Sequence, residues 1–184
     1  MDFLTRIRNK KTFSLLLLAV LLIVVFVVVR GRGPSKSKKD VVTQEATKAK
    51  ASAEINKSFE FQAINIAKKE KPVSFTITTI ERKDEIKVKN EARRTTSDKD
   101  YLLVRIELEN TQPEKLAIAT ADYIRLEDKA GKKYAPDYHN GAVVIDPIAV
   151  RKDLVAFVVT KKQKDFVLYV GELQGEKQRI EVIF

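Results

Sequence analysis

Two kinds of hydrophobic pattern divide the chain. Between Lys11 and Arg30, 18 residues follow one another without a charge, whereas after Glu54 apolar and polar residues alternate with a period of two. A long apolar run is typical of a membrane-spanning helix, and alternation is typical of strands with one buried face. The sequence therefore predicts an N-terminal transmembrane helix followed by an all-β domain.

The alternating part predicts short, half-buried strands separated by turn residues. Two later runs, Leu154 to Val159 and Phe166 to Val170, are continuously apolar and are also predicted to be strands. Arg93 to Ser97 is predicted as a polar loop and His139 to Gly141 as a turn. The alternating apolar positions are Phe59, Phe61, Ala63, Val73, Phe75, Ile77, Ile86, Val88, Leu102, Val104, Ile106, Leu108, Ile124, Leu126, Ile180, Val182 and Phe184. Short strands with frequent turns predict an antiparallel β-sandwich over residues 55–184.

The apolar run is predicted to be a transmembrane helix at residues 12–30, after a short basic tail at residues 1–11. As a helix, its uncharged part would span about 27 Å, close to the thickness of a bilayer core. Lys10, Lys11, Arg30 and Arg32 flank it, and their long side chains can extend to the headgroups.

A cleaved signal peptide is the competing interpretation of this segment. Its apolar region would be shorter, about 7 to 15 residues, and would end at a small-x-small cleavage site. Here only Gly31-Arg32-Gly33 fits that spacing, and Pro34 follows it. We therefore expect an uncleaved, single-pass anchor.

Most of the net charge of +10 lies outside the β-domain. Residues 1–54 hold 11 Lys and Arg against 4 Asp and Glu, whereas residues 55–184 hold 24 against 21. Residues 31–54 are rich in Gly, Pro, Ser and Lys, which predicts a basic flexible linker. Because the folded part is nearly balanced in charge, nucleic-acid binding is not expected.

The flanking charges do not decide the orientation in the membrane, because both ends of the helix are basic. Large domains are translocated largely regardless of such charges. We expect a cell-membrane protein whose short tail lies inside and whose C-terminal domain is extracytoplasmic.

Composition argues against catalysis. The chain has no cysteine, no tryptophan and a single histidine, His139, so thiolate chemistry is excluded and most of the usual acid–base and zinc groupings are not expected. Glu107 and Glu109 lie about 7 Å apart on one strand face, a separation that the two carboxylates of a glycosidase could use, but their alternation with core residues beside Arg105 indicates a solvated face. Asp98, Asp100 and Glu127-Asp128 lack the ligand number and glycine placement of a calcium loop. No enzyme, metal or cofactor is predicted.

One segment gathers several potential recognition side chains. Asp137, Tyr138, His139 and Asn140 offer an acid, a phenol, an imidazole and an amide within four residues. A ligand-binding loop is one interpretation. The alternative is a long turn in which Asp137 and Asn140 cap backbone groups.

Four segments resemble a known family: YLLVRIELEN (Tyr101 to Asn110), IRLEDKAGKKYAPD (Ile124 to Asp137), LVAFVVTKKQKDFVLYV (Leu154 to Val170) and the terminal IEVIF. The chain resembles, from Ser58 to Phe184, a bacterial and archaeal domain of unknown function with an immunoglobulin-like β-sandwich, common on secreted lipoproteins and membrane-anchored surface proteins. The most specific match is a strand ending in Asn110 and followed by Leu126, Asp128, Gly131 and Tyr134.

This chain departs from that family in two places. It has no lipidated cysteine, and Val159-Thr160 stands where many relatives have valine-proline. The resemblance implies the fold and export but no reaction.

The sequence thus predicts a non-catalytic interaction module on the cell surface. Its partners would be the lipid bilayer, through the N-terminal helix, and an envelope or extracellular protein; the oligomeric state is not fixed. The alternative is a module facing the cytoplasm, whose polybasic linker senses anionic lipid.

Overall fold

The computed structural model describes residues 42–43, 48–89 and 91–184. The described residues form one compact unit. The predicted tail, the predicted helix with its flanking Lys10, Lys11, Arg30 and Arg32, and most of the predicted linker lie outside the described residues. Of the helices in the described part, none has the length and apolar character needed to cross a membrane.

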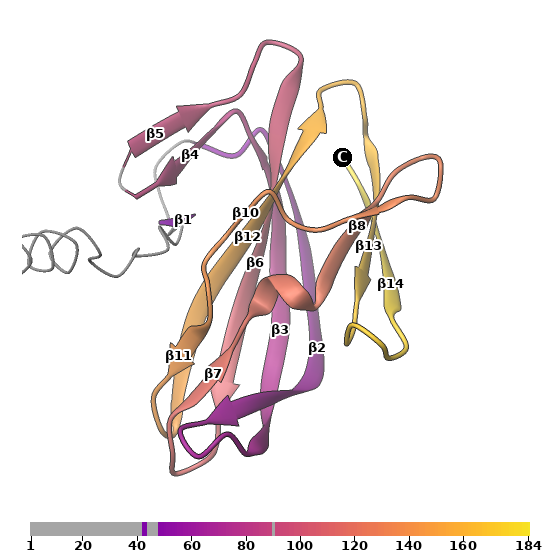
Figure 1. Ribbon diagram of the computed structural model, residues 1–184. Coiled ribbons are helices and arrows are strands. Elements are labelled where there is room, and N and C mark those ends of the chain that lie inside the picture. The colour runs from indigo at the N-terminus through magenta and orange to yellow at the C-terminus, as the bar shows by residue number, and fades with distance from the viewer. Residues whose placement is uncertain (1–41, 44–47, 90) are drawn as a thin grey trace, which may run out of the picture. The chain divides into compact units, whose positions relative to one another are not determined.

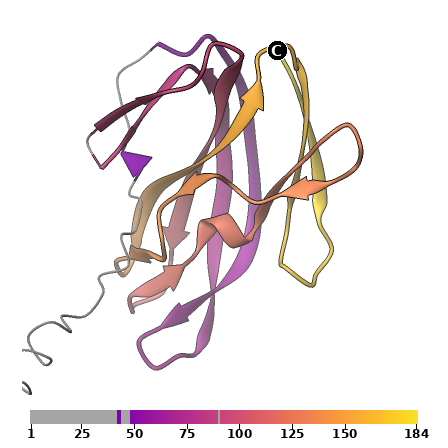
Figure 2. The same ribbon diagram turned by 45° about the horizontal axis from the view of Figure 1, so that its top comes forward.

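The described chain is all-β apart from one 3-10 turn, η2 (Thr120–Asp122), and its strands form three antiparallel sheets (Figures 1 and 2). The largest has the order β10-β12-β6-β3-β2-β7-β11. A four-stranded sheet has the order β14-β13-β8-β9, and a three-stranded sheet the order β1-β4-β5. The strand bounds are β1 Val42–Thr43, β2 Ala51–Asn65, β3 Glu70–Lys83, β4 Glu85–Val88, β5 Glu91–Arg94, β6 Lys99–Asn110, β7 Leu116–Ile118, β8 Ile124–Glu127, β9 Lys133–Tyr134, β10 Tyr138–His139, β11 Val143–Ile145, β12 Ala149–Thr160, β13 Asp165–Val170 and β14 Gln178–Ile183.

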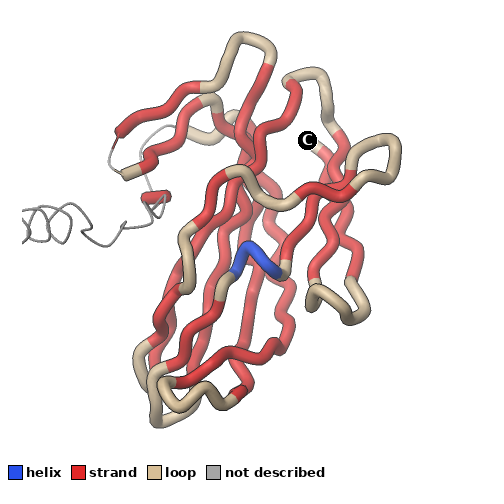
Figure 3. The backbone as a smooth tube through the Cα atoms, in the orientation of Figure 1, coloured by secondary structure: helices blue, strands red, loops and turns tan. Residues whose placement is uncertain are grey.

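The two larger sheets enclose one core and make the domain a β-sandwich. Phe75 and Phe157 of the seven-stranded sheet and Phe166 and Leu168 of the four-stranded sheet are fully buried in the same hydrophobic cluster. The tube in Figure 3 shows the long strands β2, β3, β6 and β12 as one layer, with β8, β13 and β14 in the other. Tyr123 joins the layers, because its ring stacks on Phe61 at 4.4 Å between centroids.

The predicted alternation is confirmed: the alternating positions are buried, except for Phe184, which is half-buried. The continuous run in β12 also has a physical reason. Val155 and Phe157 face the main core, whereas Ala156 faces a second cluster on the outer side of the sheet. Both faces of β12 are covered there, so both must be apolar.

The hairpin of β4 and β5 supplies that outer cover. Ile86 and Val88 of β4 pack against Tyr101, Leu103 and Ala156 in a separate buried cluster. Tyr138 packs on its margin, with its ring edge-to-face against Tyr101 at 5.7 Å. The hairpin thus turns one part of an otherwise solvated sheet face into a small core.

Three boundaries differ from the sequence expectation. The strand β2 begins at Ala51, inside the predicted linker, because its partner β3 extends far enough for Ala51 to pair with Arg82. Arg93 and Arg94 belong to β5 rather than to a loop, since they pair with β4. Tyr138 and His139 form β10 rather than a turn. In each case hydrogen bonds to a partner strand make the segment a strand, and the local sequence alone does not show that pairing.

Four residues of the most specific family match, Leu126, Asp128, Gly131 and Tyr134, lie in one hairpin. The Asp128 carboxylate accepts hydrogen bonds from the backbone N–H groups of Ala130 and Lys132, both at 2.9 Å, and from the Tyr134 hydroxyl at 3.0 Å. Gly131 has a φ of +79°, which glycine adopts without strain. These bonds, the backbone bond from Lys132 first, hold the pKa of Asp128 below its usual value. The motif therefore closes the turn between β8 and β9.

Candidate functional site

The predicted recognition segment lies on the edge strand β10 and on either side of it. Asp137 accepts a hydrogen bond from the backbone N–H of Val158 at 2.7 Å. Tyr138 is half-buried against Tyr101, and His139 is exposed, with Nδ1 2.8 Å from the Asn140 carbonyl oxygen. The structure therefore turns Asp137 and Tyr138 toward neighbouring strands, which leaves His139 as the side chain of this group that is exposed on β10.

Asn140 reaches a buried carboxylate. Its Nδ2 donates to Asp153 Oδ1 at 2.5 Å, and the Thr120 hydroxyl donates to Asp153 Oδ2 at 2.5 Å. Asp153 and Thr120 are both buried. This set ties the segment after β10 to β12 and η2, so it stabilises the connection between strands. A ligand role for residues 137–140 stays a prediction.

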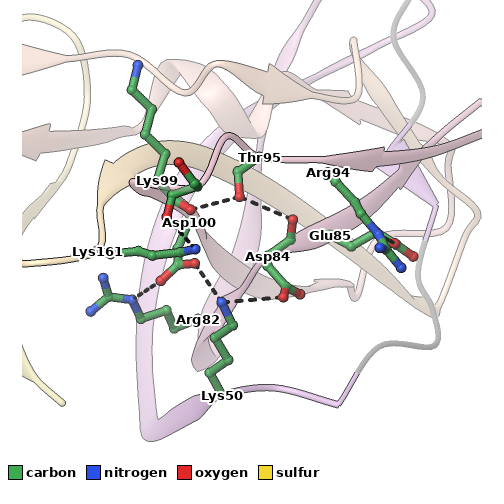
Figure 4. A network of polar contacts seen from close by, with 10 residues as sticks. Lys50, Arg82, Asp84, Glu85, Arg94, Thr95, Lys99, Asp100 and Lys161 are labelled. Atoms are coloured by element: carbon green, nitrogen blue, oxygen red, sulfur yellow. Dashed lines mark hydrogen bonds and ion pairs between the residues drawn. The ribbon is translucent and has the colours of Figure 1, made fainter.

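A second polar group lies where β2 enters the sandwich (Figure 4). Asp100 and Arg82 are buried and form an ion pair at 2.8 Å between Nε and Oδ2. Lys50 donates to the other Asp100 oxygen at 2.8 Å and lies 3.4 Å from Asp84. We call Lys50, Arg82, Asp84 and Asp100 the charged cluster.

The charged cluster is closed. The remaining Arg82 nitrogen atoms donate to the carbonyl oxygens of Gln163 at 2.7 Å and Thr160 at 2.9 Å. The guanidinium also lies over the Phe166 ring, 5.9 Å from its centroid, and so connects the two layers. Since each nitrogen of the Arg82 guanidinium and both oxygens of Asp100 already have a partner, we interpret the charged cluster as a structural connection rather than a binding site.

The opposite end of the domain has a different character. Three turns meet there, residues 66–69, 111–115 and 146–148, and we call them together the loop end. Five of the eight exposed large hydrophobic residues in the described part lie in these turns or within two residues of them, which is an uneven distribution for a domain surface. They are Ile64, Ile66, Val144, Ile148 and Val150.

Strand pairing places three apolar residues in one row beside the turns. Ile64 of β2 lies opposite Ala117 of β7, and Ala117 lies opposite Val144 of β11. Ile64 and Val144 are about half exposed, and Ala117 is partly exposed. The turns on either side carry Ile66, 90 % exposed, and Ile148, 78 % exposed. The loop end therefore presents a short apolar band with two projecting isoleucines.

Two buried asparagines hold the turns in place. Asn110 Nδ2 donates to the carbonyl oxygens of Glu114 at 2.8 Å and Asp146 at 2.9 Å, and its Oδ1 accepts from the Gln112 N–H at 2.9 Å. Asn65 donates to the Glu114 carboxylate at 2.8 Å and accepts from the Lys69 N–H at 2.8 Å. All three turns are thus joined by side-chain bonds, so the apolar band is pre-organised.

Ile148 has a strained backbone conformation and an exposed side chain. It follows Pro147 in the turn between β11 and β12 and has a φ of +49°. Glycine or asparagine is favoured at such a position, and a β-branched residue there is an outlier. A residue that is both strained and exposed contributes little to folding, which points to selection for something other than stability.

Sequence reasoning missed this end because its residues are scattered over separate segments. Ile66 stands alone in a turn beside Lys68 and Lys69, and Ile64 reads as one more strand residue. One local signal was present: Pro147 followed by isoleucine where a turn favours glycine. Glu107 and Glu109 lie on β6, in register with Lys152 and Val150 of β12.

Comparison with known proteins gives the fold and no activity. No family model matches the chain, and no curated protein matches its sequence. A conserved hypothetical protein from Bacillus anthracis is similar in structure, with a TM-score of 0.51 and 14 % identity over 73 % of this chain and 99 % of its own. At that identity the likeness shows a shared fold.

Two further crystal structures are more distant. An uncharacterized β-sandwich protein from Clostridium difficile 630 has a TM-score of 0.46 and 18 % identity, covering 75 % of this chain and 99 % of its own. The yjhA protein from Bacillus subtilis has a TM-score of 0.40 and 12 % identity, covering 68 % and 96 %.

Proposed function

We propose that this chain is a non-catalytic interaction module that binds a protein partner through the loop end. The observation that carries the proposal is Ile148, an exposed, β-branched residue held at positive φ within a rigid apolar band. Exposed apolar surface on a pre-organised frame is typical of protein-binding sites. The immunoglobulin-like class of the sandwich and its export, both implied by the family resemblance, belong to the same proposal.

The position of the loop end fits a partner held away from the point where the chain enters the domain. The strand β2 begins beside the charged cluster and runs the length of the sandwich to Ile64 (Figure 1). Its 15 residues extend roughly 50 Å. If residues 12–30 anchor the chain in the cell membrane, with the domain extracytoplasmic, the apolar band lies on the far side of the domain from the tether.

Photocrosslinking tests the proposal directly. A photoreactive residue at Ile66 of the full chain in intact cells should capture one protein partner, because that side chain projects furthest into solvent. The same residue at Leu173, which is 63 % exposed in another loop, is the matched control and should not capture it. Capture of lipid alone, or equal capture from both positions, would contradict the proposal.

Affinity then tests the named residues. The pair Ile66→Ser and Ile148→Ser should weaken binding of the captured partner about 30-fold, the usual size of a hot-spot loss. Leu173→Ser should leave the Kd unchanged. An unchanged Kd in the Ile66/Ile148 variant would show that the partner binds elsewhere.

A further inference from the structure

The strand β14 is an open sheet edge of unusual regularity for this domain. It pairs with β13 alone, in continuous register from Gln178 to Ile183, and it contains no proline and no bulge. The other sheets end in strands of two to four residues. The free side of β2 is interrupted by a bulge near Asn56, whose φ is +47°. Bulges and short edges are the usual protections against strand pairing, and β14 has neither.

The backbone groups that face outward from β14 follow from its pairing. Phe184 donates its N–H to the Lys164 carbonyl oxygen at 3.1 Å, so residues of the same parity point toward β13. Opposed residues in an antiparallel pair alternate between bonded and non-bonded. The N–H and C=O groups of Arg179, Glu181 and Ile183 therefore point away from β13, toward the free side.

The charges along this edge are complementary to themselves. Arg179 and Glu181 are exposed and lie on the same face of the strand, where they already form an ion pair. If a second β14 runs antiparallel about a two-fold axis at Ile180, Arg179 of each copy lies opposite Glu181 of the other. Those residues also exchange backbone hydrogen bonds, since their groups face outward. Moving the axis to Glu181 would instead set two carboxylates against each other.

We propose that two copies of this chain associate through antiparallel pairing of β14 with β14 about Ile180, joining their four-stranded sheets into one. The interaction is isologous, since the same residues serve on both copies. On the core-facing side Ile180 meets Ile180 of the second copy. One strand pair is a small contact, so the association is weak and depends on concentration and salt.

Disulfide cross-linking tests the register of the proposed β14–β14 pairing. The chain has no cysteine, so a single introduced thiol can only cross-link to a second copy. In Ile180→Cys the two Cα atoms would be about 4.5 Å apart, which suits a disulfide. Oxidation of the full chain should give a covalent dimer from Ile180→Cys and much less from Glu181→Cys. Equal cross-linking of the two variants, or none from Ile180→Cys, would overturn the proposal.

Exchanging the charges of Arg179 and Glu181 provides a second test, in which the double variant should restore the self-association that each single variant weakens. Arg179→Glu or Glu181→Arg alone should weaken self-association of the full chain roughly tenfold. Each of these variants places two pairs of like charges opposite each other across the axis. The double variant, with both charges exchanged, should restore it. Glu91→Arg on β5 is the control for net charge and should have no effect. Sedimentation equilibrium measures all four. Failure of the double variant to recover, or a chain that stays monomeric throughout, would exclude this pairing, as would association only with a strand of another protein.

Discussion

Ile148 combines a left-handed backbone with an exposed apolar side chain, and each costs free energy. Its φ of +49° is strained for a β-branched residue, and 78 % of the residue faces solvent. Asn110, which donates to the Asp146 carbonyl oxygen two residues before Ile148, does the opposite: it is buried and joins two of the turns, residues 111–115 and 146–148. A stabilising asparagine thus supports a destabilising isoleucine, which is the arrangement expected of a binding surface.

Replacing Ile148 by asparagine should stabilise the domain. Asparagine tolerates positive φ, so Ile148→Asn should raise the free energy of unfolding by about 0.5–1 kcal/mol in urea denaturation. The same variant should bind the partner more weakly. Val150→Asn, at an exposed position within a strand, is the control and should not stabilise. Equal stability of the two variants would show that Ile148 is not strained.

The buried ion pair at the other end should be costly to break. Asp100→Asn leaves the Arg82 guanidinium buried without its countercharge, so the free energy of unfolding should fall by about 3–5 kcal/mol. Asp165→Asn, at an exposed position on β13, should change it by less than about 0.5 kcal/mol. Chemical denaturation near neutral pH gives both values, and a small effect of Asp100→Asn would mean that solvent reaches Arg82.

Asp100 should also make the free energy of unfolding fall at acidic pH. Burial acts to raise its pKa, but hydrogen bonds from Lys50 and Arg82 prevail and hold the pKa below the ordinary 3.8. The unfolded chain then binds the proton first as the pH falls, so the contribution of this carboxylate is full above 3.8 and is lost as the pH falls through the folded-state pKa. In Asp100→Asn the free energy of unfolding should depend less steeply on pH in that window.

The β4–β5 hairpin covers Tyr101, because Ile86 and Val88 of β4 pack against it. Burial, and then the neighbouring Tyr138, raise the pKa of Tyr101 from 10.0 to about 12. The folded state therefore keeps a proton that the unfolded chain releases. This stabilises the fold below pH 10.0, and the contribution is lost as the pH rises toward the folded-state value.

Opening the hairpin should be visible in the tyrosine titration. Val88→Ala removes part of the cover, so the pKa of Tyr101 should shift from about 12 back toward 10.0 in a spectrophotometric titration. Tyr101→Phe, by comparison, should abolish the late-titrating tyrosine and flatten the alkaline loss of stability. A late phase that persists in Tyr101→Phe would assign it to another tyrosine.

If residues 12–30 anchor the full chain in a membrane, as proposed, the side on which the domain lies decides which partners it can meet. With a tag at Phe184, protease added to intact cells should digest the C-terminal domain, because the domain is expected outside. Lysed cells provide the control for cleavable sites. Protection until lysis would instead favour the cytoplasmic alternative, in which the linker senses anionic lipid.

Alternation along the sequence predicted the sandwich well because each strand buries one face, and burial has a local signature in residues such as Leu102 and Val104. The short strands β10 and β11 were not predictable, since pairing with strands elsewhere in the chain, β12 and β7, defines them. The loop end was also out of reach: Ile66, Val144 and Ile148 become neighbours only when three turns are joined by Asn65 and Asn110. Such a surface exists in the tertiary structure and not in any one segment.

The long antiparallel pairing of β2 with β3 has a mechanical consequence. It extends from Ala51, beside the charged cluster, to Ile64, beside the loop end. If the proposed tether before Ala51 and the proposed partner at Ile66 pulled on the domain, the covalent backbone of β2 would carry the force, because the two points flank this one extended segment. The hydrogen bonds between β2 and β3 would not be placed under load. The sandwich should therefore stay folded while the chain transmits tension between these two points.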